Sequence, residues 1–238
     1  MRIEKIDAVN KKLEYMDIYE LYKIMSSNKI SDYQKMQFIH NNRTQIHNVM
    51  KTKITNSEFL DMMGTRPLIR FRPLKNSYTK WGDKALLAKA LGISTAQVPE
   101  YIRNVTLAMQ DLNQMHKLPL GQMDTIKTYV YRHGTSGEVV AFLDYELKNA
   151  KDLQKTLIST LQYQNGSLAE YFVRPIHRMS NKTFLNLFDV IHKNIEKAVK
   201  DRIITAEIAE KLSQDSLAQL YNIQYNSKFI NALKPVKK

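Results

Sequence analysis

Apolar side chains recur at the spacing of an α-helix through most of this chain, and this periodicity constrains its fold more than any other feature. Between residues 180 and 198 the intervals alternate between four and three, as in a heptad seam that must pack against other helices. Turn residues are scarce, with 7 Gly and 6 Pro among 238 residues, so few tight hairpins can form. The sequence therefore predicts an all-α, multi-helical protein. The residues of the seam are Phe184, Phe188, Ile191, Ile195 and Ala198.

Capping residues predict where several helices begin and end. Ser31, Ser180 and Thr205 each precede a stretch with helical periodicity, and their hydroxyl oxygens can accept hydrogen bonds from the first turn of a helix. Gly64 and Gly92 each follow such a stretch, where a left-handed backbone conformation ends many helices. The helices that open at Ser180 and Thr205 are close in sequence, so we expect them to form an αα-hairpin.

Two further apolar stretches set the expected arrangement of the remaining chain. Apolar residues from Leu143 to Leu161 keep one face apolar and predict one helix of about six turns. Leu107 and Leu112 are expected to be buried on a helix that runs to about His116.

We expect three regions in the chain, with one continuous domain as the alternative. They are an N-terminal helical region (1–63), a basic arm followed by a helix pair (64–118) and a C-terminal helical bundle (119–238).

Several kinds of site are not expected from the composition. The chain has no cysteine, which excludes disulfides and cysteine-ligated metals. Its 6 histidines lack the spacing of ligand pairs, and no carboxylates are paired on one helix face for acid–base work. We therefore expect no metal, no cofactor and no enzymatic activity. The N-terminus is charged and no apolar run could span a bilayer, so we expect a cytoplasmic protein that does not contact membranes.

Positive charge is concentrated in one short segment. The chain carries a net charge of +13, which attracts polyanions such as nucleic acid. Residues 64–84 hold six basic and one acidic side chain, an excess of positive charge equal to that of the whole of residues 119–238. The alternative is that the charge is compositional, because lysine outnumbers arginine 26 to 10. The basic residues of the segment are Arg66, Arg70, Arg72, Lys75, Lys80 and Lys84.

This basic segment, residues 64–84, is predicted to be an extended arm. Pro67 and Pro73 prevent a continuous helix. Arginine binds phosphate bidentately, and the interleaved Phe71, Tyr78 and Trp81 could stack on exposed bases. The alternative is a basic loop whose aromatic side chains pack on the core while its cations stay solvated. In the first case the arm supplies affinity for the nucleic-acid backbone.

The residues that follow the arm have the pattern of two helices joined by a tight turn. Ala88 is small enough for a close helix crossing, Gly92 can adopt the positive φ of the turn, and Ser94 can cap the second helix. This stretch, about 20 residues long, resembles the helix-turn-helix motif of bacterial DNA-binding proteins. The remaining positions that such helices bury are apolar here as well: Leu87, Leu91, Ile93, Val98 and Ile102.

The resemblance implies which residues would touch DNA. In that family the first residues of the second helix meet base edges in the major groove, and neighbouring cations contact phosphates. Pro99 lies within the second helix, which favours an alternative in which the helix begins at Pro99 and the turn covers residues 93–98. Base contacts are expected from Ser94, Thr95, Ala96, Gln97, Glu100 and Arg103, and phosphate contacts from Lys84 and Lys89.

A second short motif points to chemistry but is explained by helix capping. Arg132-His133-Gly134 resembles the Arg-His-Gly motif of histidine phosphatases, in which the histidine takes the phosphoryl group and the arginine clamps it. That family places the motif after a strand of an α/β sheet, whereas here it ends a predicted helix. Gly134 suits a helix C-cap, and the two cations suit the negative end of the helix dipole.

The leading functional hypothesis is a non-enzymatic nucleic-acid-binding protein, with DNA as the expected nucleic acid, that uses the basic arm and the helix pair. The alternative is a helical adaptor or structural protein that binds another protein, with the positive charge compositional. The C-terminal bundle could support a homo-oligomer.

Overall fold

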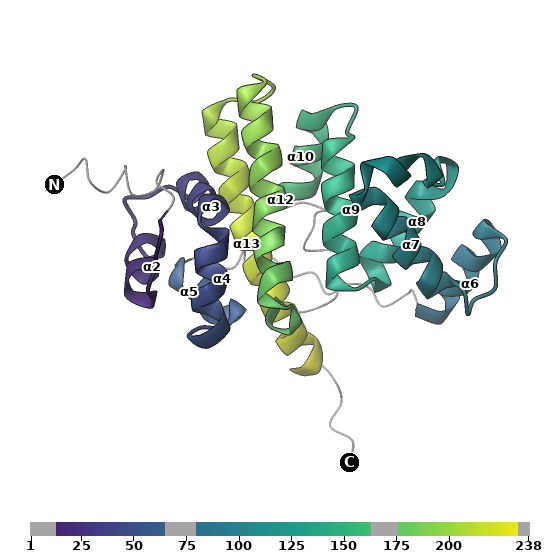
Figure 1. Cartoon of the computed structure of the whole chain (residues 1–238), viewed down its shortest axis with the longest axis horizontal. Helices are drawn as coiled ribbons and strands as arrows, with labels where there is room; N and C mark the ends of the chain where they lie inside the picture. Colours follow the sequence, from purple (N-terminus) through teal and green to yellow (C-terminus); the bar gives the residue numbers. More distant parts are fainter. Residues whose placement is uncertain (1–12, 65–79, 163–175, 233–238) are drawn as a thin grey trace, which may run out of the picture.

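The computed structural model describes residues 13–64, 80–162 and 176–232; for residues 80–81 and 224–232 it describes the backbone only. The described residues are all-helical and contain no strand. This confirms the all-α, multi-helical fold. In Figure 1 the α12/α13 pair stands in the middle, with α2–α5 on one side and α6–α8 at the far end of the other.

The N-terminal helices are short, and side-chain caps mark where α2, α3 and α5 begin. Ser31 and Thr55 each form a complete capping box with the residue three positions later, which satisfies both orphan donors at the helix start. Gly64 has a φ of 65° and ends the last of these helices in the predicted left-handed conformation. The helices are α2 (Ile18–Met25), α3 (Asp32–Asn41), α4 (Arg43–Thr52) and α5 (Asn56–Met62).

The middle of the chain forms a second group of helices. α6 packs on α8, and α7 packs on α9. Two short 3₁₀ turns, Leu112–Lys117 and Leu120–Gln122, connect α7 to α8. The helices are α6 (Lys80–Leu91), α7 (Val98–Gln110), α8 (Met123–His133), α9 (Ser136–Lys148) and α10 (Leu153–Leu161).

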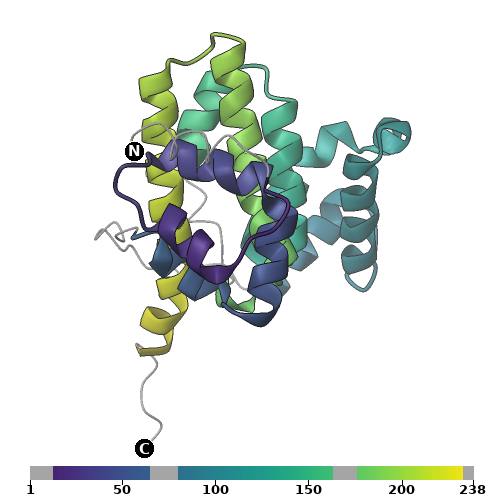
Figure 2. The ribbon, with the colours of Figure 1, turned by 60° about the vertical axis from the view of Figure 1, so that its left-hand side comes forward.

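The C-terminal helices form the predicted αα-hairpin. α12 (Asn181–Lys200) and α13 (Ala206–Ala232) pack against each other. The predicted hydroxyl caps are present: Ser180 accepts from the Thr183 amide at 3.2 Å, and Thr205 accepts from the Ile208 amide at 3.3 Å. In Figure 2 the N-terminal helices cover one side of this hairpin, and α6–α8 lie beyond its other side.

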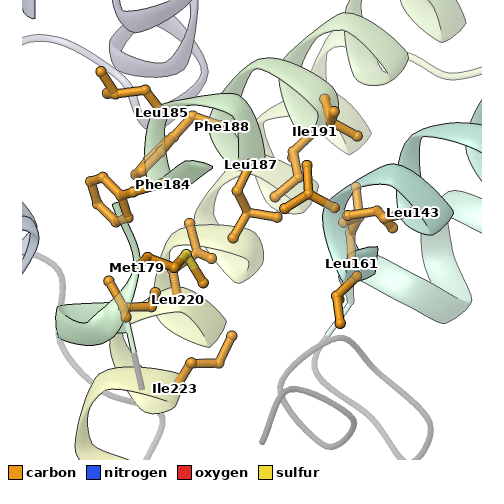
Figure 3. Packing of buried hydrophobic residues seen from close by; sticks show 14 of the residues in the cluster. Leu143, Leu161, Met179, Phe184, Leu185, Leu187, Phe188, Ile191, Leu220 and Ile223 are labelled. Carbon is orange, nitrogen blue, oxygen red and sulfur yellow. The ribbon is translucent and has the colours of Figure 1, made fainter. Parts of the chain in front are cut away.

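The core is centred on the seam of α12. All five seam residues are buried. Phe59 on α5 packs edge-on against Phe184 and Phe188, with ring centroids 5.8 and 5.9 Å apart. Figure 3 shows the α12 side chains meeting Leu143 and Leu161 on one side and Leu220 and Ile223 on the other. The N-terminal helices therefore share one hydrophobic core with the hairpin, and the division into three regions stays a prediction.

Two of the predicted helices have different bounds in the structure. The helix expected between Leu143 and Leu161 is broken, because Asn149 ends α9 and the Asp152 carboxylate caps α10 by accepting from the Lys155 amide at 2.9 Å. The helix expected to run to about His116 is shorter, because α7 ends at Gln110. An unbroken apolar face thus does not require an unbroken helix.

The predicted burial of two leucines was wrong. Leu107 is 55% exposed and Leu112 is 85% exposed. α7 ends at Gln110, and Asp111 starts a 3₁₀ turn by accepting from the Asn113 amide, which takes Leu112 off the expected helix face.

Across the described part of the chain, no helix combines the length and the apolar character that a membrane crossing requires.

Candidate nucleic-acid interface

The turn after α6 is closed by backbone hydrogen bonds around a left-handed glycine. Gly92 has a φ of 67°. The Ile93 amide donates to the Ala88 carbonyl at 3.0 Å, and the Gly92 amide donates to the Lys89 carbonyl at 3.3 Å. Open space surrounds the position of a Cβ at Gly92, so a larger residue would be strained through its backbone conformation alone. The chain thus needs glycine here to turn from α6 toward α7.

A local hydrogen-bond network shapes the start of α7. The Gln97 side-chain oxygen accepts from both the amide and the hydroxyl of Ser94, each at 2.9 Å. The Gln97 amide in turn donates to the Ser94 carbonyl at 3.1 Å. α7 begins at Val98 and holds Pro99 in its first turn, where no N–H is needed. The helix therefore begins within one residue of the alternative start at Pro99, and the turn covers residues 92–97.

The inner side of this helix pair is packed as the spacing predicts. Leu87, Ala88, Val98 and Ile102 are buried. Leu91 and Ile93 are partly buried against the same core. Burial of these side chains fixes α6, the turn and α7 on the rest of the protein.

A buried carboxylate anchors α6 to α8. The Asp83 carboxylate lies 2.6 Å from His133 Nε2 and 3.6 Å from Arg132 Nη1. The side chains of Asp83 and His133 are only 11% and 12% exposed. His133 and Arg132, which belong to the phosphatase-like motif, lie here at the end of a helix, and the described residues contain no strand that could present them. Their visible role is to hold α6 in place.

Gly134, the third residue of that motif, follows α8 with an extended backbone, φ −65° and ψ 167°. A Cβ there would lie 2.6 Å from the Val130 carbonyl oxygen. Glycine is thus required by this close approach, and not by the left-handed cap that Gly64 and Gly92 adopt.

Replacing Asp83 with alanine is expected to destabilise the protein by about 2 kcal/mol, because the largely buried His133 and the partly exposed Arg132 would lose a charge-assisted partner. Urea unfolding followed by circular dichroism measures this loss. Asp124→Ala is the matched control. The Asp124 carboxylate is fully exposed, and its ion pair with Lys127 is long at 3.8 Å. Its loss should therefore cost under about 0.5 kcal/mol. Equal losses in both variants would show that the Asp83 contact does not anchor α6.

The predicted base-contacting residues lie on the outside of the turn and of α7. Ser94, Thr95, Ala96 and Gln97 are exposed in the turn. Glu100 and Arg103 follow in the first turns of α7 and are also exposed. The Arg103 guanidinium lies 3.8 Å from the Glu100 carboxylate. The structure thus brings these residues together on one accessible part of the molecule.

The predicted phosphate-contacting residues are less well grouped. Lys89 is exposed and Lys84 is half-buried. They lie five residues apart on α6, which separates them by about 140° around the helix axis, so they do not face the same side. The prediction of an extended arm was wrong for residues 80–84, which form the first part of α6; of Lys80 only the backbone is described. The remaining cations of the arm, Arg66, Arg70, Arg72 and Lys75, lie outside the described residues.

Two exposed residues of α7 were missed in the sequence. Asn104 and Leu107 lie four and seven positions after Glu100, so they continue its stripe along the outer face. The spacing from Glu100 could have identified both residues. Leu107 was instead assigned to the core because it is apolar.

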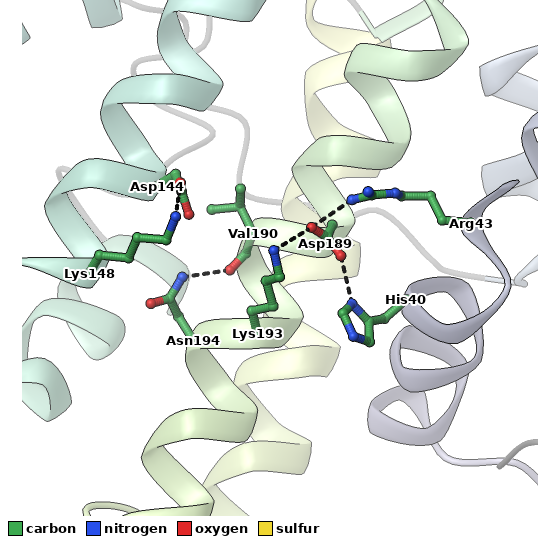
Figure 4. Close-up of polar contacts among 8 residues, drawn as sticks. All are labelled: His40, Arg43, Asp144, Lys148, Asp189, Val190, Lys193 and Asn194. Carbon is green, nitrogen blue, oxygen red and sulfur yellow. Dashed lines mark hydrogen bonds and ion pairs between the residues drawn. The ribbon is translucent and has the colours of Figure 1, made fainter. Parts of the chain in front are cut away.

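A second polar cluster joins the N-terminal helices to α12. The carboxylate of Asp189 contacts His40 Nδ1 at 2.6 Å, Arg43 Nη1 at 2.6 Å and Lys193 Nζ at 3.0 Å, as Figure 4 shows. Burial by itself would raise the pKa of Asp189, but the hydrogen bonds from His40 and Lys193 and the Arg43 charge outweigh it and lower that pKa. This cluster clamps α3 and α4 to the central helix.

His192 is buried next to this clamp. Its ring lies 5.3 Å from that of Tyr33 and 5.5 Å from that of His40. Neither ring nitrogen has a hydrogen-bond partner among the described residues. Burial, followed by the neighbouring His40, lowers the pKa of His192 to about 4, so the ring is neutral at pH 7. In the described ranges, no group of three or more His, Asp or Glu side chains could hold a metal ion.

Comparison of the chain with protein-family models, with curated proteins and with solved structures finds no match.

Proposed function

We propose that the protein binds duplex DNA with the turn between α6 and α7 and the outer face of α7. The observation that carries this proposal is the split between the two sides of the helix pair. Leu87, Ala88, Val98 and Ile102 are buried, whereas the polar residues Thr95, Gln97, Glu100 and Arg103 are exposed. The pair also lies at one end of the molecule, away from the α12/α13 hairpin (Figure 1). A duplex could approach it there without meeting the hairpin.

The hydrogen bonds of the turn determine how Gln97 would read a base. A glutamine that reads adenine bidentately must accept through its side-chain oxygen and donate through its side-chain nitrogen. The Gln97 oxygen already accepts two hydrogen bonds from Ser94, which uses both of its lone pairs. Gln97 would therefore act as a donor only, toward acceptors such as purine N7. Arg103 is suited to guanine, and Glu100 to the amino group of cytosine.

Most of the affinity would come from phosphates. The net charge of +13 supplies a general attraction, and Lys89 supplies an exposed cation beside the turn. The part of the basic arm that precedes α6 in the sequence, residues 64–79, adds three arginines. Such contacts release counterions, so binding should weaken steeply with salt.

A salt titration of binding to a random-sequence duplex, followed by fluorescence anisotropy, tests the proposal. Replacing Lys89 with alanine should weaken binding several-fold and reduce the logarithmic salt slope by about 1, and Arg103→Ala should weaken it several-fold through lost guanine contacts. Joint replacement of Arg66, Arg70 and Arg72 should reduce it by about 3. Lys200→Ala is the matched control, because it removes one exposed cation at the end of α12. If Lys89→Ala and Arg103→Ala behave like the control, the α6–α7 interface is wrong.

A protein partner is the second candidate, and exposed leucines favour it. Leu86, Leu107, Leu112 and Leu120 are all largely exposed and all lie in or next to α6–α8. Clusters of exposed apolar side chains mark protein interfaces more often than DNA interfaces. No binding of DNA even at low salt, together with a salt-insensitive complex that Leu107→Asn disrupts, would favour this candidate.

A further inference from the structure

A pocket of about 640 Å³ lies where α2, α3, α5 and α13 meet. This junction is on the side of the hairpin opposite to α6–α8 (Figure 1). Its walls carry charges of both signs, from Asp32, Lys35, Glu210, Lys211 and Asp215, and an apolar part that includes Ile30 and Met63. The pocket is therefore unrelated to the DNA interface in both position and chemistry.

Lys35 places a buried ammonium in this pocket. The residue is only 6% exposed. Among the described residues its Nζ makes one hydrogen bond, to the Met63 carbonyl at 3.4 Å, although an ammonium has three donors. Burial lowers the pKa of Lys35, while Asp32 and Glu210 act in the opposite direction. A buried cation with so little direct pairing is costly, which points to a ligand that accepts from it.

The other charges of the pocket are not equally available. The Glu210 carboxylate accepts from the amides of Asp32 and Tyr33, each at 3.0 Å, and so occupies the N-terminus of α3. Asp215 pairs with Lys211 at 2.8 Å. The Asp32 carboxylate makes no hydrogen bond within the described part of the chain, and it does not approach Lys35 within ion-pair distance. One cation and one anion, Lys35 and Asp32, thus remain without a close partner of opposite charge there.

We propose that this pocket binds a free α-amino acid, whose carboxylate accepts from Lys35 and whose ammonium donates to Asp32. A simple anion would meet the carboxylates of Asp32, Glu210 and Asp215, and a simple cation would meet Lys35. A small zwitterion satisfies both unmatched charges at once. The volume of the pocket leaves room for the ligand side chain against Ile30 and Met63.

The test is a thermal-shift and calorimetric titration of the full chain with each common L-amino acid in turn. At least one should raise the melting temperature saturably. Lys35→Met and Asp32→Asn should each weaken its binding at least about tenfold, as expected for the loss of a charge-assisted hydrogen bond. Lys35→Met should fold, because it exchanges a buried cation for an apolar side chain of similar shape. Lys200→Met, outside the pocket, should bind like the wild type.

Two derivatives of the bound amino acid separate a zwitterion site from a general polar pocket. Its N-acetyl form lacks the ammonium, and its amide form lacks the carboxylate. Each should bind at least about tenfold more weakly than the free amino acid. The proposal is overturned if no amino acid gives a saturable shift. It is also overturned if the Lys35→Met protein keeps full affinity, or if either derivative binds as tightly as the free form.

Discussion

Replacing Phe188 with alanine is expected to reduce the free energy of unfolding by about 4 kcal/mol, the usual cost of emptying a buried phenylalanine site. Phe188 is fully buried on α12. Its ring packs edge-on against Phe184 at 5.0 Å and Phe59 at 5.9 Å. For a chain of this length the loss should lower the melting temperature by about 10 °C. Urea denaturation followed by circular dichroism measures it.

This substitution also tests whether the N-terminal helices unfold together with the hairpin. Phe59 belongs to α5 and Phe188 to α12, so one aromatic cluster connects the two parts. We expect a single unfolding transition that shifts as a whole. Ile203→Ala is the control, since Ile203 is partly exposed in the tight connection between α12 and α13, and it should cost under about 1 kcal/mol. A separate early transition of α2–α5 would contradict the shared core.

Acidification from pH 6.5 to pH 4 is expected to remove about 3 kcal/mol of stability through His192 alone. The pKa of the buried ring is about 4, against 6.5 for an unperturbed histidine. In this window the unfolded chain therefore binds a proton that the folded protein does not, and stability falls as the pH is lowered. Burial is the main cause of the low pKa and the nearby His40 adds to it, whereas Asp189 opposes it.

The variant His192→Leu isolates this contribution. It removes the titrating ring and leaves a side chain of similar volume in a site where neither ring nitrogen is hydrogen-bonded to a described residue. Its stability should be nearly independent of pH between 6.5 and 4, as measured by urea titrations at several pH values. His116→Leu, at an exposed position, should keep the wild-type dependence. A full acid loss in His192→Leu would mean that another group causes it.

Asp189 adds a second, more acidic phase. Its pKa is lowered in the folded protein, so its stabilising effect is complete above its ordinary pKa of 3.8 and is lost as the pH falls through the lowered value. The two phases have opposite origins. His192 resists gaining a charge in a buried site, whereas Asp189 loses the charge that holds His40, Arg43 and Lys193.

Part of the candidate DNA interface could be predicted from the sequence, because its signals are local. Gly92 adopts the predicted positive φ, and Leu87 and Val98 are buried as their spacing indicates. The Ser94–Gln97 hydrogen bonds and the exposure of Leu107 depend on how the turn and the end of α7 close. Neither feature became visible before the structure.

The sequence by itself determined most of the helices, several of their caps and the hairpin seam. Ser31, Ser180, Gly64 and Gly92 act through backbone hydrogen bonds within a few residues, so their roles can be read from the order of residues alone. The tertiary structure decided everything that joins distant parts of the chain. Glu210 caps a helix 178 positions earlier in the sequence, Asp189 clamps α3 and α4, and Lys35 is buried where four helices meet. Such contacts follow from packing, which no local spacing encodes.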